Sequence, residues 1–412
     1  MKYLLIAFIY LFSLHSGANE KSKDTLYYMK IKAKNKFERT DVANTGVAIE
    51  KVEDNFVYAI GLKKEAQKLK KMGRLVSISP LSKSTHLLDF PPQDSQFHNY
   101  AELLEALNDI QKMAPQIVSL GELGKSLEGR SIPLVTLSEG SAEGKAGIFF
   151  MGAHHAREHL SVETPLLILK ELVQRYLNGD QHIKKLIQNR VIYIAPMVNP
   201  DGAEYDIASG SYRMWRKNRR PNDDGSYGVD LNRNYDHMWG GVGSSDDPRS
   251  QVYHGKAPFS EPETQAIRDF VTSHDNITTI LTYHSFSELI LYPWGYTYDP
   301  ISNQKDRQVF ETMAQTMSQW NHYKPQKSSD LYRTTGETCD WAYAKFGIFC
   351  FTFELDPDSI WKGGFYPGQK FIDIVFKKNF QPALYLIEYA NNPYRVLEPS
   401  HLKYGLSTPL IQ

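Results

Sequence analysis

Cysteine is nearly absent from this sequence, with only two among 412 residues. So low a count excludes a small fold held together by several disulfides and a zinc site built on clusters of cysteine. If the chain binds a transition metal, the ligands must come mainly from His, Asp and Glu side chains. The chain carries 13 histidines and 47 acidic residues that can supply them.

An excess of charge of either sign is also absent, because 47 Lys and Arg residues balance 47 Asp and Glu residues. Proteins that bind nucleic acid over a broad surface normally carry a basic excess, so we expect no nucleic-acid partner. The hydrophobic fraction of 41% and the charged fraction of 23% exclude a disordered or fibrous chain. At about 150 residues per domain, the length allows two to three domains.

Long apolar runs are missing beyond the first residues of the chain. Met1 and Lys2 precede an almost wholly apolar stretch at 4–14, and small residues follow at 16–18. This is the layout of a cleaved secretory signal, and the stretch is too short to cross a membrane. We therefore expect a signal peptide at 1–18, a secreted or periplasmic protein, and no membrane or lipid anchor.

Residues 19–82 show the strand and helix patterns of a small α+β domain. Their order, β-α-β-β-α-β, is ferredoxin-like. The five lysines of the second helix pattern indicate the solvated face of an amphipathic helix. Pro91, Pro92 and neighbouring polar residues then interrupt all periodicity, which predicts a linker at 83–96. Strands are expected at 25–34, twice within 47–60 and at 74–79, and helices at 36–42 and 62–72.

Residues 97–390 alternate apolar runs with amphipathic helix patterns, which predicts an α/β domain around one largely buried sheet. We find no internal repeat and no low-complexity tract. The segment at 391–412 has a loop-like composition and receives no assignment. Helices are expected at 101–113, 161–177, 261–272, 306–319 and 371–390, and buried strands at 132–138, 147–151, 191–197, 278–283 and 348–353.

Histidines and carboxylates follow three of these buried strands. Open α/β sheets bind ligands beyond the carboxyl ends of their strands, so such side chains would meet at one edge. A histidine and a glutamate three residues apart can point to the same side of a turn, and together they suit zinc. The side chains are His155 and Glu158 after the strand at 147–151, His284 after 278–283, and Glu354 after 348–353.

Two other histidines compete for the metal on sequence alone. His154 and His159 flank the pair, but neither has a carboxylate three residues downstream. Any one of these side chains alone would be explained best as structural. Glu354 follows so apolar a run that an unpaired, buried carboxylate would be unusual there. Four polar side chains at one sheet edge are better explained by a single site.

A basic cluster at 213–220 and the segment Asp230–Tyr235 form a further group. A charge run of this kind is ordinarily a solvated loop. A guanidinium can instead hold a carboxylate through two parallel hydrogen bonds. Combined with a metal site, such a cluster favours a hydrolase whose substrates bear a free carboxylate.

Five motifs occur in order along the larger domain: HHAREH, RMWRKNR, DLNRNYD, TYHSFSELILYPWGYT and DWAYAKFGIFCFTFEL. Over residues 97–390 the chain resembles the zinc carboxypeptidases of the pancreatic carboxypeptidase A and bacterial carboxypeptidase T type. The resemblance implies a mixed eight-stranded sheet flanked by helices and one Zn²⁺ per chain. It also implies that residues 19–82 are an activation segment, which inhibits the enzyme until another protease cleaves within 83–96.

The resemblance assigns a role to individual residues of this sequence. Peptide or protein C-termini would be the substrates, and the enzyme would be a monomeric exopeptidase made as a zymogen. The zinc ligands would be His155, Glu158 and His284; the general base Glu354; the carbonyl-polarising residue Arg216; the carboxylate clamp Asn232 and Arg233; the mobile tyrosine Tyr332; auxiliary subsite arginines Arg157 and Arg213; and the residue lining the specificity pocket Cys339.

The small, neutral Cys339 implies a pocket for apolar and aromatic C-terminal residues. Glu337 lies where bacterial relatives of mixed specificity carry an acid, so we expect Lys and Arg to be tolerated. Phe286 departs from the tyrosine of pancreatic members, so a hydroxyl is missing near an outer subsite. We expect Cys339 and Cys350 to be free, partly buried thiols rather than a disulfide, since buried Cys often acts as a small hydrophobe.

Three alternative functions remain open at this point. The first is a peptidase of the same fold that acts on peptidoglycan stem peptides. The second is an amidase or deacylase of the wider superfamily, although such proteins commonly lack elements matching Tyr332 and Arg-Met-Trp-Arg. The third is a catalytically inactive binding module, against which the complete set of ligands, base and arginines argues.

Overall fold

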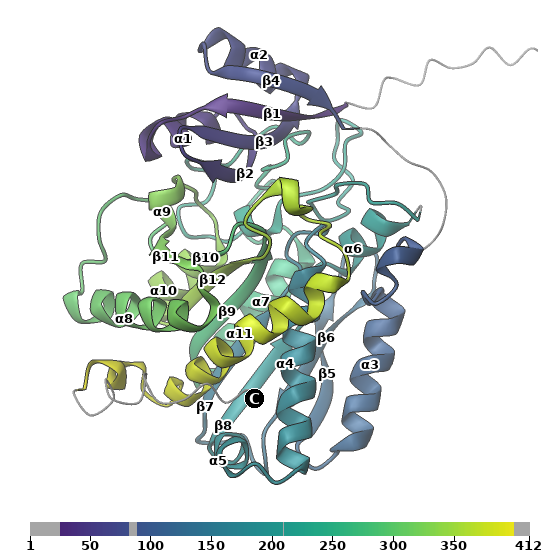
Figure 1. The fold of residues 1–412 in the computed structure, drawn as a ribbon, viewed down its shortest axis with the longest axis vertical. Coiled ribbons are helices and arrows are strands. Elements are labelled where there is room, and N and C mark those ends of the chain that lie inside the picture. Colours follow the sequence, from purple (N-terminus) through teal and green to yellow (C-terminus); the bar gives the residue numbers. More distant parts are fainter. Residues whose placement is uncertain (1–24, 82–88, 209, 399–412) are drawn as a thin grey trace, which may run out of the picture.

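The computed structural model describes residues 25–81, 89–208 and 210–398 (Figure 1). These residues form a four-stranded sheet and an eight-stranded sheet. The expected signal peptide, residues 83–88 of the predicted linker and residues 399–412 lie outside the described residues. No helix in the described ranges is both long and apolar enough to cross a membrane.

The N-terminal domain, residues 25–81, confirms the predicted ferredoxin-like order of elements. Its strands pair antiparallel in the order β2-β3-β1-β4. Helix α2 buries Ala66 and Leu69 against the sheet and leaves most of its lysines exposed, as its amphipathic pattern predicts. The elements are β1 (Leu26–Lys32), α1 (Lys36–Ala43), β2 (Ala48–Glu53), β3 (Phe56–Leu62), α2 (Lys63–Lys71) and β4 (Leu75–Pro80).

The larger domain is built on a mixed sheet of strand order β11-β10-β12-β9-β7-β8-β6-β5. Strands β12, β9, β7 and β8 are parallel neighbours at its centre, and antiparallel pairs flank them. The strands are β5 (Val118–Lys125), β6 (Ser131–Leu137), β7 (Ala146–Met151), β8 (Arg190–Ala195), β9 (Ile277–Ser285), β10 (Leu289–Tyr292), β11 (Lys324–Lys327) and β12 (Phe349–Leu355).

Helices cover both faces of this sheet, which explains why its central strands are almost wholly apolar. One buried cluster joins the sheet to α3, α4, α8 and α11, and Figure 1 shows α4 and α11 lying across that face. A second cluster joins the other face to α7 and α10. The helices are α3 (Tyr100–Met113), α4 (Leu160–Leu177), α5 (Gln181–Asn189), α6 (Pro200–Ile207), α7 (Pro262–Ser273), α8 (Gln304–Asn321), α9 (Ser328–Leu331), α10 (Thr338–Phe346) and α11 (Lys370–Tyr389).

Part of the predicted linker belongs to the larger domain. Phe90 is buried and its ring lies 4.8 Å from that of His159. Asp94 is also buried, and its carboxylate accepts hydrogen bonds from the hydroxyl of Tyr212 at 2.7 Å and the backbone N–H of Gln369 at 3.0 Å. Residues 89–96 are therefore fastened to the larger domain, although their prolines and polar residues resemble a linker.

The N-terminal domain rests on the end of the eight-stranded sheet (Figure 1). Arg39 donates hydrogen bonds to two backbone carbonyl oxygens of the larger domain, at 2.6 and 2.9 Å. Ser250 donates from its hydroxyl to the carbonyl of Gly46 at 2.7 Å. Ile60 forms an apolar cluster with Phe286 and Phe365. Polar and apolar contacts thus hold the two domains together.

The expectation of two free thiols is wrong, because Cys339 and Cys350 form a disulfide. Helix α10 packs beside β12 and brings their Cα atoms to 5.0 Å, within the range that a disulfide spans. The two residues lie in different elements, so their spacing along the sequence did not reveal this approach.

We predict that replacing both cysteines with alanine lowers the free energy of unfolding by about 3 kcal/mol, because the bridge restricts the unfolded chain. Denaturant unfolding of the variant and the parent protein would measure the difference. As a control, a reducing agent should destabilise the parent protein and leave the variant unchanged. Equal stability of the variant and the oxidised parent would contradict the prediction.

Candidate active site and zinc site

Three predicted metal ligands converge at the carboxyl end of the sheet. His155 and Glu158 lie in the turn between β7 and α4, and His284 lies near the end of β9. Nδ1 of His284 is 3.1 Å from Nδ1 of His155 and 3.0 Å from a Glu158 oxygen, while Nδ1 of His155 is 2.8 Å from the other oxygen. All three side chains are buried, so lone pairs and a carboxylate face one another away from bulk water.

The chemistry of this donor set fits zinc. Two imidazole nitrogens and one carboxylate form a set that binds Zn²⁺ and leaves a position for water. Nε2 of His155 lies 3.1 Å from the carboxylate of Asp230. Because a carboxylate accepts, Nε2 carries the proton and Nδ1 is left with the lone pair that a metal needs. Among the described residues, His155, Glu158 and His284 are the group whose donor atoms lie close enough together to hold one metal ion.

The competing histidines are engaged elsewhere. His154 is fully buried, and its Nε2 lies 2.9 Å from the hydroxyl of Tyr235. His159 is held by Asp206, with Nε2 at 2.9 Å from the carboxylate. Both are therefore structural neighbours of the site.

Asp230 links the predicted metal ligands to the arginine cluster. Its second oxygen accepts from Nε of Arg216 at 3.0 Å, and Nη2 of Arg216 is 2.9 Å away. Burial alone would raise the pKa of Asp230, but Arg216 and then His155 hold that pKa well below its ordinary value. Asp230 thus stays ionised and fixes both neighbours. Sequence reasoning gave it no role, although it begins the motif DLNRNYD.

Glu354 lies opposite the predicted metal ligand His284 in the parallel pairing of β12 with β9. Burial, followed by the charge of Glu158, raises the pKa of Glu354 to about 8. His155 and Arg216 act in the opposite direction. A carboxyl group with such a pKa can both take up and return a proton near neutral pH.

Hydrogen bonds within the protein hold two more predicted site residues, Arg233 and Asn232, in place. The guanidinium of Arg233 donates through Nε to the carbonyl of Gly243 at 3.1 Å and through Nη1 to the carbonyl of Asn232 at 2.6 Å. These bonds orient the guanidinium on a buried loop. The side-chain oxygen of Asn232 is held by Thr338, at the start of α10.

The larger part of the predicted site surrounds a single cavity of about 420 Å³, which also has walls from the N-terminal domain. Tyr332 is among the lining residues and also packs against the core of that domain. The predicted site residues that line the cavity are His155, Glu158, Arg216, Asn232, Arg233, His284, Tyr332 and Glu354.

Three predicted site residues lie outside the cavity lining. Arg213 is exposed, and its guanidinium lies 4.3 Å from the ring centre of Tyr205. Arg157 is fully buried and donates from Nη2 to Glu50 of the N-terminal domain at 2.6 Å. No sequence pattern pointed to Glu50, because its partner is distant in the chain.

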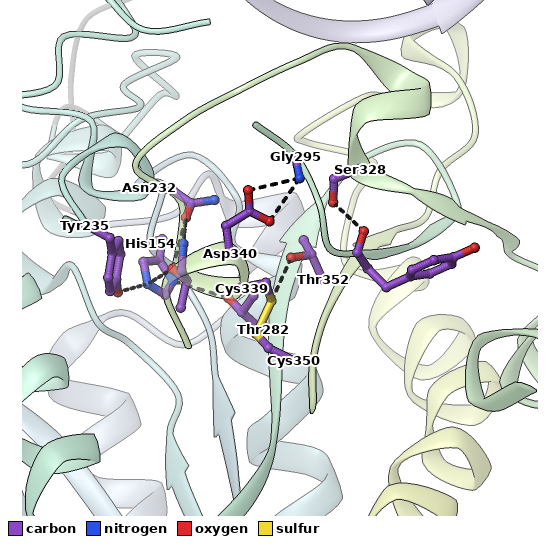
Figure 2. The surroundings of a disulfide bond; sticks show 12 residues. His154, Asn232, Tyr235, Thr282, Gly295, Ser328, Cys339, Asp340, Cys350 and Thr352 are labelled. Atoms are coloured by element: carbon purple, nitrogen blue, oxygen red, sulfur yellow. Dashed lines mark hydrogen bonds between the residues drawn. A yellow bond between two sulfur atoms is a disulfide. The ribbon is translucent and has the colours of Figure 1, made fainter. Parts of the chain in front are cut away.

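The position of Cys339 differs from the expectation. Its sulfur is bonded to Cys350 (Figure 2), it belongs to a buried apolar cluster, and it is not among the residues that line the cavity. Glu337 and Thr352, its neighbours in the structure, line the cavity instead. The sequence offered a hint in Glu337, which lies two residues before the cysteine.

Comparison with known proteins agrees with this geometry. Residues 103–382 match the zinc carboxypeptidase family. A zinc carboxypeptidase of Saccharothrix mutabilis subsp. capreolus is 36% identical over 75% of this chain and 73% of its own. Carboxypeptidase A1 of Rattus norvegicus is 34% identical over 63% of this chain and 62% of its own.

The fold is also found among solved structures. The carboxypeptidase A of Helicoverpa armigera superposes with a TM-score of 0.73 at 24% identity, and the match covers 92% of this chain and 99% of that one. At this identity, the likeness shows the fold alone. The family match and the relatives of higher identity show the class of enzyme. The chain belongs to the zinc carboxypeptidase family and is a metallocarboxypeptidase.

Proposed function

We propose that the protein is a secreted exopeptidase, made as a zymogen, that removes the C-terminal residue of peptides with broad specificity. The observation that carries this proposal is the single cavity that gathers a His-Glu-His set, Glu354, Arg216 and the pair Asn232–Arg233. An inactive binding module would not need this complete set. The internal disulfide also suits an oxidising compartment outside the cytosol.

In the proposed mechanism, the guanidinium of Arg233 and the amide of Asn232 bind the terminal carboxylate of the substrate. This contact places the last peptide bond beside Glu354. A zinc ion held by His155, Glu158 and His284 would supply Lewis-acid chemistry and lower the pKa of a water molecule.

Proton transfer and charge stabilisation would then fall to two residues of the chain. The carboxylate of Glu354 takes a proton from the attacking water and later returns one to the leaving amine. Arg216 stays charged because Asp230 and other carboxylates outweigh the effect of burial and raise its pKa. Its guanidinium would stabilise the oxyanion that develops at the scissile carbonyl.

The N-terminal domain would act as the inhibitory segment of the zymogen. Arg39, Glu50 and Val52 of this domain contribute to the cavity wall, so the site lies between the two domains. Glu50 and Arg157 form an ion pair whose side chains are 3% and 0% exposed. Removing one partner of such a buried pair is strongly destabilising, because the other charge is left unpaired. This ion pair would therefore stabilise the form in which the N-terminal domain covers the site.

Glu337 would allow the specificity pocket to accept basic residues. Burial raises the pKa of Glu337 well above its ordinary value, and Asp340 adds to this effect. Its Oε1 atom is buried and has no hydrogen-bond partner among the described residues. A neutral carboxyl tolerates apolar side chains, whereas a Lys or Arg of the substrate would favour its ionised form.

We predict that Glu354→Gln lowers kcat of the activated enzyme by about 10²- to 10⁴-fold, because glutamine cannot take a proton. Bound zinc, measured by elemental analysis, should remain at the parental level. Glu288→Gln is the matched control, since Glu288 also lines the cavity but its carboxylate pairs with Lys378. Near-normal turnover by Glu354→Gln would refute the mechanism.

For the zymogen, we predict that Glu50→Gln raises the basal peptidase activity of the uncleaved chain by about tenfold or more, because the buried ion pair is lost. Glu53→Gln serves as the control, since Glu53 lies on the same strand but pairs with Lys51 instead. If Glu50→Gln left the uncleaved chain as inactive as the control, this ion pair would not maintain inhibition.

Specificity is tested with peptides that end in Phe, Leu, Arg or Asp. We expect kcat/KM to be highest for Phe and Leu, lower for Arg and lowest for Asp. Glu337→Gln should lower kcat/KM for Arg by about tenfold through the loss of a charged contact, with little change for Phe. A preference for Asp, or an equal effect of the substitution on Arg and Phe, would disprove this account.

A further inference from the structure

Four consecutive residues, from Glu337 just before α10 to Asp340 in its first turn, connect this helix to the site and to the elements around it. Glu337 lines the cavity, and Thr338 holds Asn232. Cys339 is bonded to β12, the strand that carries Glu354. The carboxylate of Asp340 accepts hydrogen bonds from the backbone N–H groups of residues 295 and 296, at 2.9 Å from each. Figure 2 shows Asn232, the disulfide and the contact of Asp340 with Gly295 around this turn.

The contact between Thr338 and Asn232 fixes the orientation of an amide. The Oδ1 atom of Asn232 lies 3.0 Å from the backbone nitrogen of Thr338 and 2.9 Å from its hydroxyl. A backbone N–H can only donate, so the amide atom that faces it must be the oxygen. The NH₂ group of Asn232, a residue that lines the cavity, is therefore the part of the amide left to face the substrate.

This orientation matters because the ligand is an anion. An NH₂ group donates hydrogen bonds to a carboxylate, whereas the amide oxygen would repel it. The two orientations differ by a half-turn of the amide and have nearly the same shape. With fewer of these two donors behind it, Asn232 would present the wrong atom to the substrate for a larger part of the time.

We propose that Thr338 is the positioning residue that makes Asn232 select a free C-terminal carboxylate. It acts through Asn232 and does not itself line the cavity. Thr338 is 1% exposed, and its hydroxyl also lies 3.3 Å from Nε2 of His154. The neighbouring Cys339–Cys350 disulfide and the contacts of Asp340 hold the turn in place. This inference rests on the proposed role of Asn232 as part of the carboxylate clamp.

Three substitutions of Thr338 keep both of its donors, one of them or neither. Thr338→Ser keeps both donors, and Thr338→Val keeps the shape and the N–H but loses the hydroxyl. Thr338→Pro removes both donors. Proline fits because Thr338 is the first residue of α10, where helices accept it, and because Glu337 has the extended conformation (φ −95°, ψ 158°) that precedes proline.

The zinc-loaded enzyme in its active form is assayed with one peptide that ends in phenylalanine. We expect KM within about twofold of the parent for Thr338→Ser, about fivefold higher for Thr338→Val and about thirtyfold higher for Thr338→Pro, at one net hydrogen bond per step. The value of kcat should change by less than about twofold, because the contact contributes equally to substrate and transition-state binding. A general loss of folded enzyme would lower kcat and leave KM unchanged.

Binding provides a second readout that is independent of turnover. Calorimetry compares phenylalanine with phenylalanine amide, which lacks the carboxylate. The preference for the free acid should fall in the order Ser, Val, Pro. Unchanged KM and unchanged preference in both Thr338→Val and Thr338→Pro would overturn the inference. If Thr338→Pro does not fold, Thr338→Val alone decides the question.

Asn232→Ala separates this inference from the proposed function. We expect it to raise KM for the free-acid peptide by about tenfold or more, through the loss of a hydrogen bond to a charged group. An unchanged KM would refute the clamp and the positioning role together. A raised KM for Asn232→Ala beside unaffected Thr338 variants would refute the positioning role alone.

Discussion

One buried carboxylate, that of Asp230, holds the site together. It is within hydrogen-bond distance of the ring of His155, the guanidinium of Arg216 and the backbone N–H of Asn232. The proposed metal ligand His155, the proposed cation for the oxyanion and one half of the proposed carboxylate clamp therefore share a single anchor. Asp230 thus fixes the positions of these groups relative to one another. Catalysis depends more on this relative placement than on how tightly any one group is bound.

The predicted site residues of the larger domain come partly from the ends of strands and partly from loops. The ends of β9 and β12 supply His284 and Glu354 on adjacent parallel strands, so their spacing follows from the sheet itself. The arginines come from the long segment between α6 and α7, which the hydrogen bonds of its own buried side chains hold in place. The site thus combines precise spacing from the sheet with charge from the loops.

Much of this arrangement was predictable from the sequence, and the reasons differ by element. The central strands and amphipathic helices carry strong hydrophobic patterns because both faces of the sheet are buried. The edge strand β5 was missed because it has glycines and exposed positions, and β10 and β11 were missed because they are only 4 residues long. The disulfide and the ion pair between Glu50 and Arg157 depend on distances between elements, which no local pattern records.

The segment at 89–96 has a consequence for the separation of the two domains. Every contact described above for Phe90 and Asp94 is with a residue of the larger domain: His159, Tyr212 or Gln369. A break in the chain before this segment would leave those contacts whole. The larger domain would begin with an end already docked on its surface, and release of its neighbour would expose the surface that the two domains share, including Phe286 and Phe365.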